Sequence, residues 1–462
     1  SPADGTLTFE GTVTLAERYP QAPQARVWSA KQEHPARNNP AGELYQHGMF
    51  HGPRLQGVQH LRRWADEAIE ADMLAIPTQD YFAFTTTPQL RMDAALLDAA
   101  GQLAAYWITE RQSWDYTCFP FQVRHFTQYA DPPPGGTRLI CRGDLRMLND
   151  VRLEAHFDLI DEQGRLIARA AGWGSRRFQT TQNLYHFRFD PLGRFVSQNW
   201  PTPVLAQSGV VARLLPAFPE GYFDEGGGLW QRMLANLVLN ANERQFYHRQ
   251  LPPSGPRREE WLLGRVAAKE AVREWLLREH GLRLSGADIE ITNAANGQPL
   301  IAQIAGLPSG IAVPVISISH SRRAALAACA PAGSELGVDY QHLDRVDAED
   351  LIAGAFTAAE TQRFVRTQTS IDVKRAAVAL WCAKEAAAKA AGSGLEGRPR
   401  DWEIVAADLE QRGAQSPTVD VRHAGIEYKV ELHFAKIAVF ALCCHRPNNS
   451  GLAPLAIAKV VH

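Results

Sequence analysis

The C-terminal half of the chain carries one sequence pattern twice, and this duplication constrains the fold more than any other feature. In the first copy, Glu243 is followed 27 residues later by the glutamate of the run Ala267–Val272. In the second copy, Glu360 is followed 25 residues later by the glutamate of Cys382–Ala387. Alanine, lysine and glutamate are strong helix formers, so each run predicts a helix. We therefore expect two related units, each with helices on one side of a small sheet, and a cleft between them.

Polar residues end two short apolar runs in this half. Ile316–Ser321 ends in Ser-His-Ser, and Gly337–Gln341 carries Asp339. Such runs are typical of buried strands that bring a polar side chain to the rim of a sheet. On the second predicted helix, Glu385 and Lys389 are four residues apart and share one face. Two carboxylates and a lysine in this arrangement could hold a hard cation against a phosphate.

Four motifs of this half resemble, in type and order, those of the large, pseudo-dimeric class of 4′-phosphopantetheinyl transferases. They are Ser319–Ser321, Gly337–Asp339, Phe356–Glu360 and Trp381–Lys389. Each motif alone is a weak signal, but their common order is a strong one. The resemblance implies an α+β fold duplicated about a pseudo-two-fold axis. It also implies transfer of the phosphopantetheine arm of coenzyme A to a serine of an acyl carrier protein.

The resemblance further implies roles for individual residues. Mg²⁺ prefers oxygen ligands and commonly takes one or two protein carboxylates, which here would be Asp339 and Glu385. Glu385, or a water that it holds, would be the base for the incoming serine. Contacts to coenzyme A and its phosphates would come from His320, Ser319, Lys384, Lys389, Arg265 and Lys269.

Three positions qualify this assignment. Gln341 stands where many relatives have a third acidic group, so its part in metal binding is open. Gln298 replaces a lysine of the family's Gly-Lys-Pro turn, which removes one expected contact. Glu360 is expected to cap or brace its helix rather than to act in the site.

The N-terminal part predicts a long helix wrapped by an antiparallel sheet, which is a hot-dog fold. The run Leu96–Trp107 is rich in alanine and leucine and indicates the helix. A meander of strand-like runs follows, and residues 6–15 alternate apolar with small polar residues, which predicts an earlier strand. The runs of the meander are residues 119–126, 138–148, 151–160 and 165–172.

Two stretches of this part, Phe-His-Gly-Pro-Arg-Leu-Gln-Gly-Val and Leu-Leu-Asp-Ala-Ala-x-Gln-Leu, resemble the second half of double hot-dog dehydratase domains of polyketide and polyunsaturated fatty acid synthases. The resemblance implies that Asp98 is a general acid oriented by Gln102. We find no His-x-x-x-Gly-x-x-x-x-Pro motif, which supplies the partner histidine in that family, and we expect His47 and His51 to be structural or to line a substrate tunnel.

Dehydration needs a base for the α-proton and an acid for the leaving hydroxyl. Asp98 supplies only one of the two groups. The missing half could lie in upstream sequence, or a second chain could supply it through a hot-dog homodimer. Alternatively, the domain only binds its ligand, or Asp98 is purely structural.

Length and composition set the wider frame. A chain of 462 residues predicts two to four domains at about 150 residues each. A net charge of −2 argues against binding nucleic acid or a membrane surface through bulk charge. The six cysteines show neither a disulfide framework nor a zinc pattern, and we find no membrane-spanning run or leader. We expect a cytoplasmic chain, and its start at Ser1 is compatible with a fragment.

The predicted domains follow from these patterns. A hot-dog region comes first, and a Pro- and Gly-rich connection separates it from the duplicated transferase and a short tail. The boundaries are 1–190 for the hot-dog region, 191–228 for the linker, 229–447 for the transferase with repeats at 229–330 and 331–447, and 448–462 for the tail.

Two functions from different classes remain open. The first is a Mg²⁺-dependent phosphopantetheinyl transferase that activates the acyl carrier protein of a polyketide or fatty acid megasynthase. The second is a dehydratase fragment acting on β-hydroxyacyl carrier thioesters, with the C-terminal half kept as a degenerate carrier-docking module. The intact residues Asp339, Glu385 and Lys389 favour the first function, whereas Gln341 and Gln298 keep the second open.

Overall fold

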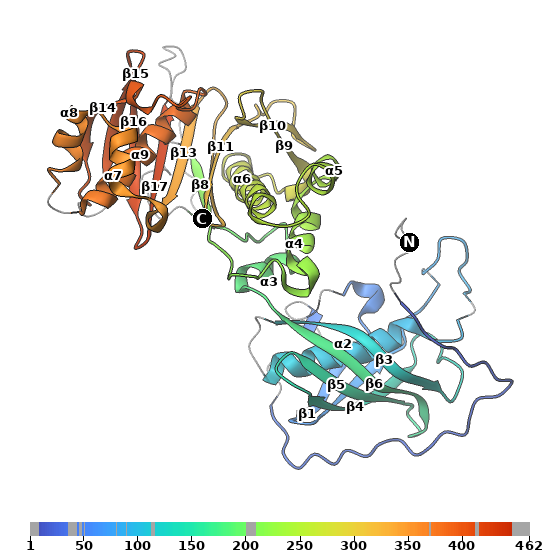
Figure 1. The fold of residues 1–462 in the computed structure, drawn as a ribbon. Helices are drawn as coiled ribbons and strands as arrows, with labels where there is room; N and C mark the ends of the chain where they lie inside the picture. The colour runs from blue at the N-terminus through green and yellow to red at the C-terminus, as the bar shows by residue number, and fades with distance from the viewer. Residues whose placement is uncertain are drawn as a thin grey trace, which may run out of the picture. The chain divides into compact units, whose positions relative to one another are not determined.

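The chain forms two compact units, Ser1–Tyr185 and His186–His462 (Figure 1). The computed structural model describes residues 9–35, 44–45, 49, 51–79, 81–88, 90–111, 116–199, 209–368, 371–411 and 415–445. None of the helices in these ranges is long and apolar enough to cross a membrane. The predicted tail and His47 lie outside the described residues.

The first unit is a six-stranded antiparallel sheet packed against one long helix, α2 (Ala94–Arg111), as the hot-dog prediction requires (Figure 1). The helix and one face of the sheet share a core in which Trp107 and Leu103 are fully buried. In sheet order the strands are β1 (Val58–Ala65), β2 (Ala68–Leu74), β4 (Arg138–Met147), β5 (Arg152–Ile160), β6 (Leu166–Gln179) and β3 (Tyr116–Gln128). The helix and the strand meander predicted from the sequence are confirmed.

A glycine lets α2 lie close to the sheet. A Cβ atom on Gly101 would lie 2.2 Å from the ring of Trp173 on β6, so no larger residue fits without a shift of the tryptophan. Trp107 also donates a hydrogen bond from its indole Nε1 to the carbonyl of Ala65, at 2.9 Å. Together these contacts fix the depth of the helix and thereby the position of its first turn.

The strand predicted at residues 6–15 is wrong for the described part. Residues 9–15 form no strand, and the side chains of Phe9, Val13 and Leu15 are 81–88% exposed. Alternation favours a strand only where a partner strand supplies hydrogen bonds and a core covers the apolar face. This segment has neither within the described residues.

The second unit contains the two predicted repeats. The first repeat packs α6 (Pro256–His280) against a four-stranded sheet of β11 (Val315–Ser321), β12 (Ala324–Ala330), β8 (Val211–Leu215) and β7 (Gln198–Asn199). Its other elements are α4 (Glu225–Val238), α5 (Ala241–Arg249) and the hairpin of β9 (Ile289–Asn293) and β10 (Pro299–Ile304), and α3 (Gln182–Phe189) spans the boundary with the first unit.

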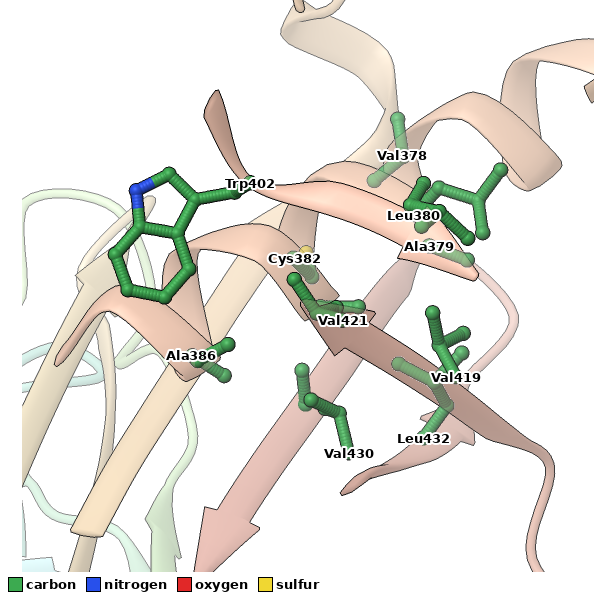
Figure 2. Close-up of a cluster of buried hydrophobic side chains, with 14 of the residues drawn as sticks. Val378, Ala379, Leu380, Cys382, Ala386, Trp402, Val419, Val421, Val430 and Leu432 are labelled. Atoms are coloured by element: carbon green, nitrogen blue, oxygen red, sulfur yellow. The ribbon is translucent and has the colours of Figure 1, made fainter. Parts of the chain in front are cut away.

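The second repeat packs α9 (Val373–Ala390) against a five-stranded antiparallel sheet (Figure 2). In sheet order its strands are β13 (Glu335–His342), β17 (Ala438–His445), β16 (Ile426–Phe434), β15 (Thr418–His423) and β14 (Glu403–Asp408). Before α9 come α7 (Ala348–Ala355), α8 (Ala358–Glu360) and a π-helical turn, Thr361–Val365.

Small side chains dominate the face of α9 that meets the sheet. Ala379, Cys382 and Ala386 are fully buried, and they pack against valines of β15 and β16 (Figure 2). The two repeats also share a core between them, formed by residues of β8, β12, β13 and β17. The duplicated α+β architecture predicted from the two sequence copies is therefore present.

The predicted linker at 191–228 needs correction. Within it, Val211–Leu215 forms β8, which pairs along five positions with β12 and therefore belongs to the sheet of the first repeat. This apolar run is short and lies between proline- and glycine-rich segments, so the sequence pattern indicated a linker instead of a strand. The first repeat thus begins well before residue 229.

Gly337 on β13 allows the strand to lie directly on α9. A Cβ atom at this position would stand 1.8 Å from the carbonyl oxygen of Ala386 and 2.6 Å from the backbone nitrogen of Ala390. Both obstacles are backbone atoms of the helix, so they cannot move aside independently. The glycine therefore sets the distance between β13 and α9.

We predict that Gly337→Ala destabilises the protein by about 3 kcal/mol, at the upper end of what overpacking usually costs, because the strand must move away from the helix. Chemical denaturation of the purified chain measures this change. Gly354→Ala is the matched control, since a Cβ atom there meets nothing within 4 Å and alanine is the better helix former. Equal stability of the two variants would contradict the argument.

Candidate active site

Asp339 is a buried carboxylate on β13, two residues after Gly337 and therefore on the same face of the strand. The residue is 6% exposed. Its Oδ1 accepts a hydrogen bond from the hydroxyl of Ser319, on β11, at 2.9 Å. Strand β13 and Ser319 of β11 together hold this carboxylate in one orientation toward α9.

Glu385 supplies a second carboxylate from α9. It is half-buried, and burial together with the nearby charge of Asp339 raises its pKa, while Lys389 opposes that rise. Within the described ranges its carboxylate has neither a hydrogen bond nor an ion pair. A carboxylate that is partly desolvated, close to a second one and without a hydrogen-bonding partner is suited to receive a cation.

Lys389 lies one turn after Glu385 and contacts the other carboxylate. Its Nζ lies 2.7 Å from Asp339 Oδ1 and donates to the carbonyl of Val338 at 3.0 Å. The lysine side chain is 28% exposed, so it is only partly buried. The predicted group of Asp339, Glu385 and Lys389 is therefore brought together by β13 and α9.

These donors fit Mg²⁺ in the way such ions are usually held by enzymes that act on phosphates. No group of three or more histidine, cysteine, aspartate or glutamate residues capable of holding a metal occurs among the described residues. Mg²⁺ accepts as few as one or two carboxylates when substrate phosphates and water complete its shell. Asp339 and Glu385 provide two, and Gln341 follows on the same face of β13.

Ser319 and His320 differ in their surroundings. The Ser319 hydroxyl donates to Asp339 and accepts the backbone N–H of Tyr340 at 3.1 Å, and the residue is 6% exposed. It holds the metal-ligand candidate rather than facing a ligand, which argues against its predicted contact with coenzyme A. The His320 side chain is 48% exposed, with Nδ1 3.6 Å from a carboxylate oxygen of Glu260.

Arg265 is fixed by two neighbours on the first repeat. Its guanidinium stacks over Trp261, with 4.2 Å to the ring centroid, and donates to the side chain of Asn293 at 2.7 Å. Burial lowers its pKa to about 10, so it is cationic at neutral pH. The turn that follows Asn293 touches the second repeat, since Asn296 donates to the carbonyl of Gly392 at 2.8 Å.

The structure argues against the predicted phosphate roles of Lys384 and Lys269. Both side chains are 0% exposed. Lys384 pairs with Glu360 at 2.9 Å and donates to the carbonyl of Ala355, and Lys269 pairs with Glu243. The resemblance implied that they contact coenzyme A and its phosphates, but each points into the protein toward a carboxylate. Neither ammonium is free to meet a phosphate.

The two buried pairs occupy equivalent places in the two repeats. Glu243 accepts the backbone N–H of Ile291 and closes a capping box with Asn240 at the start of α5. Glu360 accepts the N–H of Ile404 and closes a capping box with Thr357 at the start of α8. The bracing role predicted for Glu360 is confirmed, and the sequence duplication has a structural counterpart.

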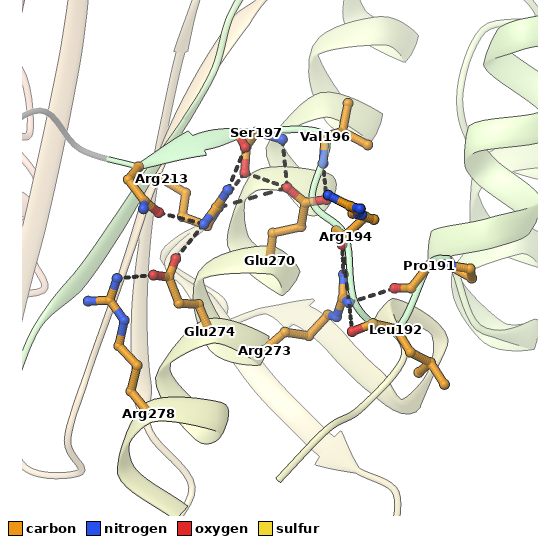
Figure 3. A network of polar contacts seen from close by, with 11 residues as sticks. Pro191, Leu192, Arg194, Val196, Ser197, Arg213, Glu270, Arg273, Glu274 and Arg278 are labelled. Carbon is orange, nitrogen blue, oxygen red and sulfur yellow. Dashed lines mark hydrogen bonds and ion pairs between the residues drawn. The ribbon is translucent and has the colours of Figure 1, made fainter. Parts of the chain in front are cut away.

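The first repeat carries a charge-inverted version of the Asp339 and Lys389 pair (Figure 3). On β8, Val211 pairs with Cys329 of β12, and Arg213, two positions later, pairs with Ala327. On β13, Gly337 pairs with Cys443 of β17, and Asp339, two positions later, pairs with Ala441. Arg213 therefore holds the strand position in the first repeat that Asp339 holds in the second. On α6, Glu274 comes four residues after Glu270, and on α9, Lys389 comes four residues after Glu385.

Arg213 and Glu274 form an ion pair in which both side chains are at most 8% exposed. The equivalent of Glu385 is Glu270, whose carboxylate accepts the backbone N–H groups of Val196 and Ser197 at 2.7 and 2.8 Å (Figure 3). Here the helix carboxylate is fully satisfied by the preceding chain. Within the described structure the second repeat therefore differs in its helix carboxylate, because Glu385 has no hydrogen-bonding partner.

The hot-dog unit holds a separate polar cluster at the start of α2. Asp98 Oδ2 lies 3.3 Å from His51 Nε2 and accepts a hydrogen bond from Gln102 Nε2 at 2.8 Å. Gln102 also donates to the carbonyl of Leu55 and accepts from the hydroxyl of Tyr45, both at 2.8 Å. Burial lowers the pKa of His51, which favours its neutral form at neutral pH.

The sequence did not identify His51 as the partner of Asp98, nor Ser319 as the support of Asp339. His51 lies 47 residues before Asp98, so no helical or strand spacing connects the two. A hydrogen bond from the Gln56 side chain to the carbonyl of His51, at 2.9 Å, helps to hold this loop. The sequence signal that could have identified His51 is its place directly before Gly-Pro, in the stretch that carries the dehydratase resemblance.

Two carboxylates and a lysine thus lie together on a duplicated α+β scaffold. Residues 335–443 match the sequence model of the 4′-phosphopantetheinyl transferase superfamily, so this part of the chain is a domain of that superfamily. The match covers the second repeat, including Asp339, Glu385 and Lys389. Residues 22–183 match the model of the polyketide synthase dehydratase N-terminal domain, in agreement with the hot-dog fold. The motifs around Asp98 resemble the second half of such domains, and that assignment stays a prediction.

Several solved structures resemble the chain weakly. The dehydratase domain of RzxB from Pseudomonas fluorescens is 18% identical over 30% of this chain and 48% of that chain, with a TM-score of 0.24. The dehydratase domain from the CurJ module of the curacin polyketide synthase is 17% identical over 32% of this chain and 51% of that chain, with a TM-score of 0.25. A bifunctional dehydratase-cyclase domain in ambruticin biosynthesis is 22% identical over 34% of this chain and 54% of that chain, with a TM-score of 0.25. The chain spans about half the length of each. No curated protein is similar enough in sequence to count as a match.

We predict that Lys384→Met destabilises the protein by about 3–5 kcal/mol, because the Glu360 carboxylate would stay buried without its counter-charge. Chemical denaturation measures the loss, and the double variant E360Q/K384M should lose less than the two single variants together. Lys436→Met, on an exposed hairpin, is the control and should change stability by less than about 0.5 kcal/mol. Unchanged stability combined with weaker coenzyme A binding would restore the phosphate role predicted from the sequence.

Proposed function

We propose that the C-terminal domain transfers the 4′-phosphopantetheine arm of coenzyme A to a serine of an acyl carrier protein in a Mg²⁺-dependent reaction. The observation that carries the proposal is the convergence of Asp339, Glu385 and Lys389 between β13 and α9. The superfamily match supports the reaction class. The neighbouring dehydratase-type domain favours a carrier of a polyketide or fatty acid synthase as the partner.

In this reaction the serine oxygen forms a bond to the phosphorus that carries the pantetheine arm. The bond between that phosphorus and the oxygen of 3′,5′-ADP breaks, and the serine proton must be accepted. Charge develops on the phosphate oxygens, so catalysis depends mainly on positioning and neutralisation. When bound, Mg²⁺ would supply charge neutralisation, held by Asp339 and Glu385.

The chain's own residues would divide the remaining tasks. Glu385, whose pKa is raised by burial and by Asp339, would accept the serine proton directly or through a water. Lys389, whose side chain is partly exposed, would contact the pyrophosphate. His320, which is exposed, and Arg265, which is half-buried, are candidate hydrogen-bond donors to other phosphates of coenzyme A.

We propose a second activity for the hot-dog unit, acid–base chemistry on a β-hydroxyacyl thioester, because His51 lies within 3.3 Å of Asp98. Neutral His51 would take the α-proton, and Asp98 would act as the general acid that gives a proton to the leaving hydroxyl. The C–H and C–O bonds break, a C=C bond forms and water leaves. The network through Gln102 and Tyr45 would hold Asp98 in place.

For the transferase, we predict that an apo acyl carrier protein incubated with the chain, coenzyme A and Mg²⁺ gains about 340 Da, the mass of one phosphopantetheine arm in this phosphoryl-transfer reaction. Intact-mass spectrometry measures the gain, and Asp339→Ala and Glu385→Gln should abolish it. Glu427→Gln, an exposed carboxylate on β16 paired with Arg422, is the control that keeps activity. No gain with several carriers would refute the proposed transferase and leave a docking module as the better account.

For the hot-dog unit, we predict that a β-hydroxyacyl pantetheine thioester loses one water in the presence of the chain, detected by mass spectrometry. Asp98→Asn and His51→Gln should each reduce the rate by about 10²-fold or more, the range in which general acid–base groups act. His60→Gln is the control, since this histidine is half-exposed on β1 and faces Asp72 instead. Turnover that survives in the His51 variant would exclude it as the base.

A further inference from the structure

Lys389 has two roles that compete with each other, and the proposal below rests on the transferase function proposed above. In the ligand-free structure its ammonium lies 2.7 Å from Asp339 Oδ1. A phosphate contact requires the same ammonium to face a pyrophosphate, and Mg²⁺ binding requires the same carboxylate. One positive charge already neutralises Asp339, whereas Glu385 beside it has no counter-ion contact within the described ranges.

We propose that Lys389 is an exchangeable counter-ion of Asp339: it occupies the cation position in the ligand-free protein and leaves when an anionic pyrophosphate draws its ammonium away. Metal and coenzyme A would then bind with positive coupling. The coupling is reciprocal, since each ligand must favour the other by the same factor at equilibrium.

The first repeat shows what a permanent version of this ion pair looks like. Arg213 and Glu274 occupy the equivalent strand and helix positions, and their side chains are 5% and 8% exposed. Arg213 is also held by the side chains of Ser197 and Asn199, both at 2.6 Å. This ion pair is closed off from solvent and fully braced.

The pair in the second repeat is built differently. The Lys389 side chain is 28% exposed, and besides Asp339 its ammonium contacts only the carbonyl of Val338 within the described structure. Asp339 keeps a second support, the hydroxyl of Ser319, which would hold it in place after the lysine leaves. A flexible four-carbon stem lets the ammonium move without a change in the helix.

A titration of Mn²⁺ into the ligand-free protein tests the proposal without using activity. Metal binding is followed by electron paramagnetic resonance of free Mn²⁺ for the unaltered chain, K389M, K389R and K374M. We expect K389M to bind Mn²⁺ at least about fivefold more tightly than the unaltered chain, because the competing ammonium is gone. K389R keeps the charge and should resemble the unaltered chain.

Lys374→Met is the matched control, because it removes an ammonium from the same helix about 22 Å away along its axis. It should leave the Mn²⁺ affinity unchanged. In the unaltered chain, saturating coenzyme A should tighten Mn²⁺ binding by at least about fivefold, and this factor should shrink in K389M. A blank titration of Mn²⁺ into coenzyme A alone corrects for binding in solution.

The outcomes separate this proposal from the transferase itself. Equal or weaker Mn²⁺ binding by K389M, with normal binding by the unaltered chain in the presence of coenzyme A, would overturn the counter-ion exchange and leave the transferase proposal intact. Absence of Mn²⁺ binding in every variant, with or without coenzyme A, would overturn both the exchange and the metal site. Thermal unfolding of each variant establishes that K389M is folded during the titration.

Discussion

The contact between β13 and α9 at Gly337 is the constraint on which the active site depends. Because this glycine has no side chain, the strand lies directly on the backbone of the helix at Ala386. That closeness brings Asp339, two residues along the strand, beside Glu385 and Lys389 on the helix. The alanine-rich face of α9 serves the same end, because small buried side chains let the whole sheet approach. The site is thus a consequence of tight packing.

Duplication explains both the scaffold and the difference between the two helix carboxylates, of which only Glu270 has hydrogen-bonding partners among the described residues. Each repeat braces its helix with a buried glutamate–lysine pair, Glu243 with Lys269 and Glu360 with Lys384. At the position where the second repeat places Asp339, the first repeat places Arg213, and its helix carboxylate, Glu270, binds backbone N–H groups instead. With the charges reversed and every group satisfied, the first copy of the site is structural. In the second copy the Glu385 carboxylate has no partner among the described residues, which is costly to stability and useful for binding a cation.

In the hot-dog unit, too, close packing at a glycine positions a carboxylate. Gly101 lets α2 pack closely against Trp173, and the second turn of the helix then presents Asp98 to the loop that carries His51. Gln102 cannot reverse its amide, because its nitrogen donates to Asp98 and Leu55 while its oxygen accepts from Tyr45. A chain of satisfied hydrogen bonds thereby fixes the orientation of one partly exposed carboxylate.

The sequence by itself determined the two fold classes, the duplication, and the group of Asp339, Glu385 and Lys389, because these depend on local periodicity and on motifs with a regular spacing. It could not decide where long side chains point. Lys384 and Lys269 were assigned to contacts with coenzyme A, and only the tertiary structure shows that each points inward to a buried glutamate. The pairing of His51 with Asp98, the support of Asp339 by Ser319 and the place of β8 in a sheet were likewise decided by contacts between segments far apart in the chain. Spacing along one element carries no information about such contacts, since they arise only when separate elements pack together.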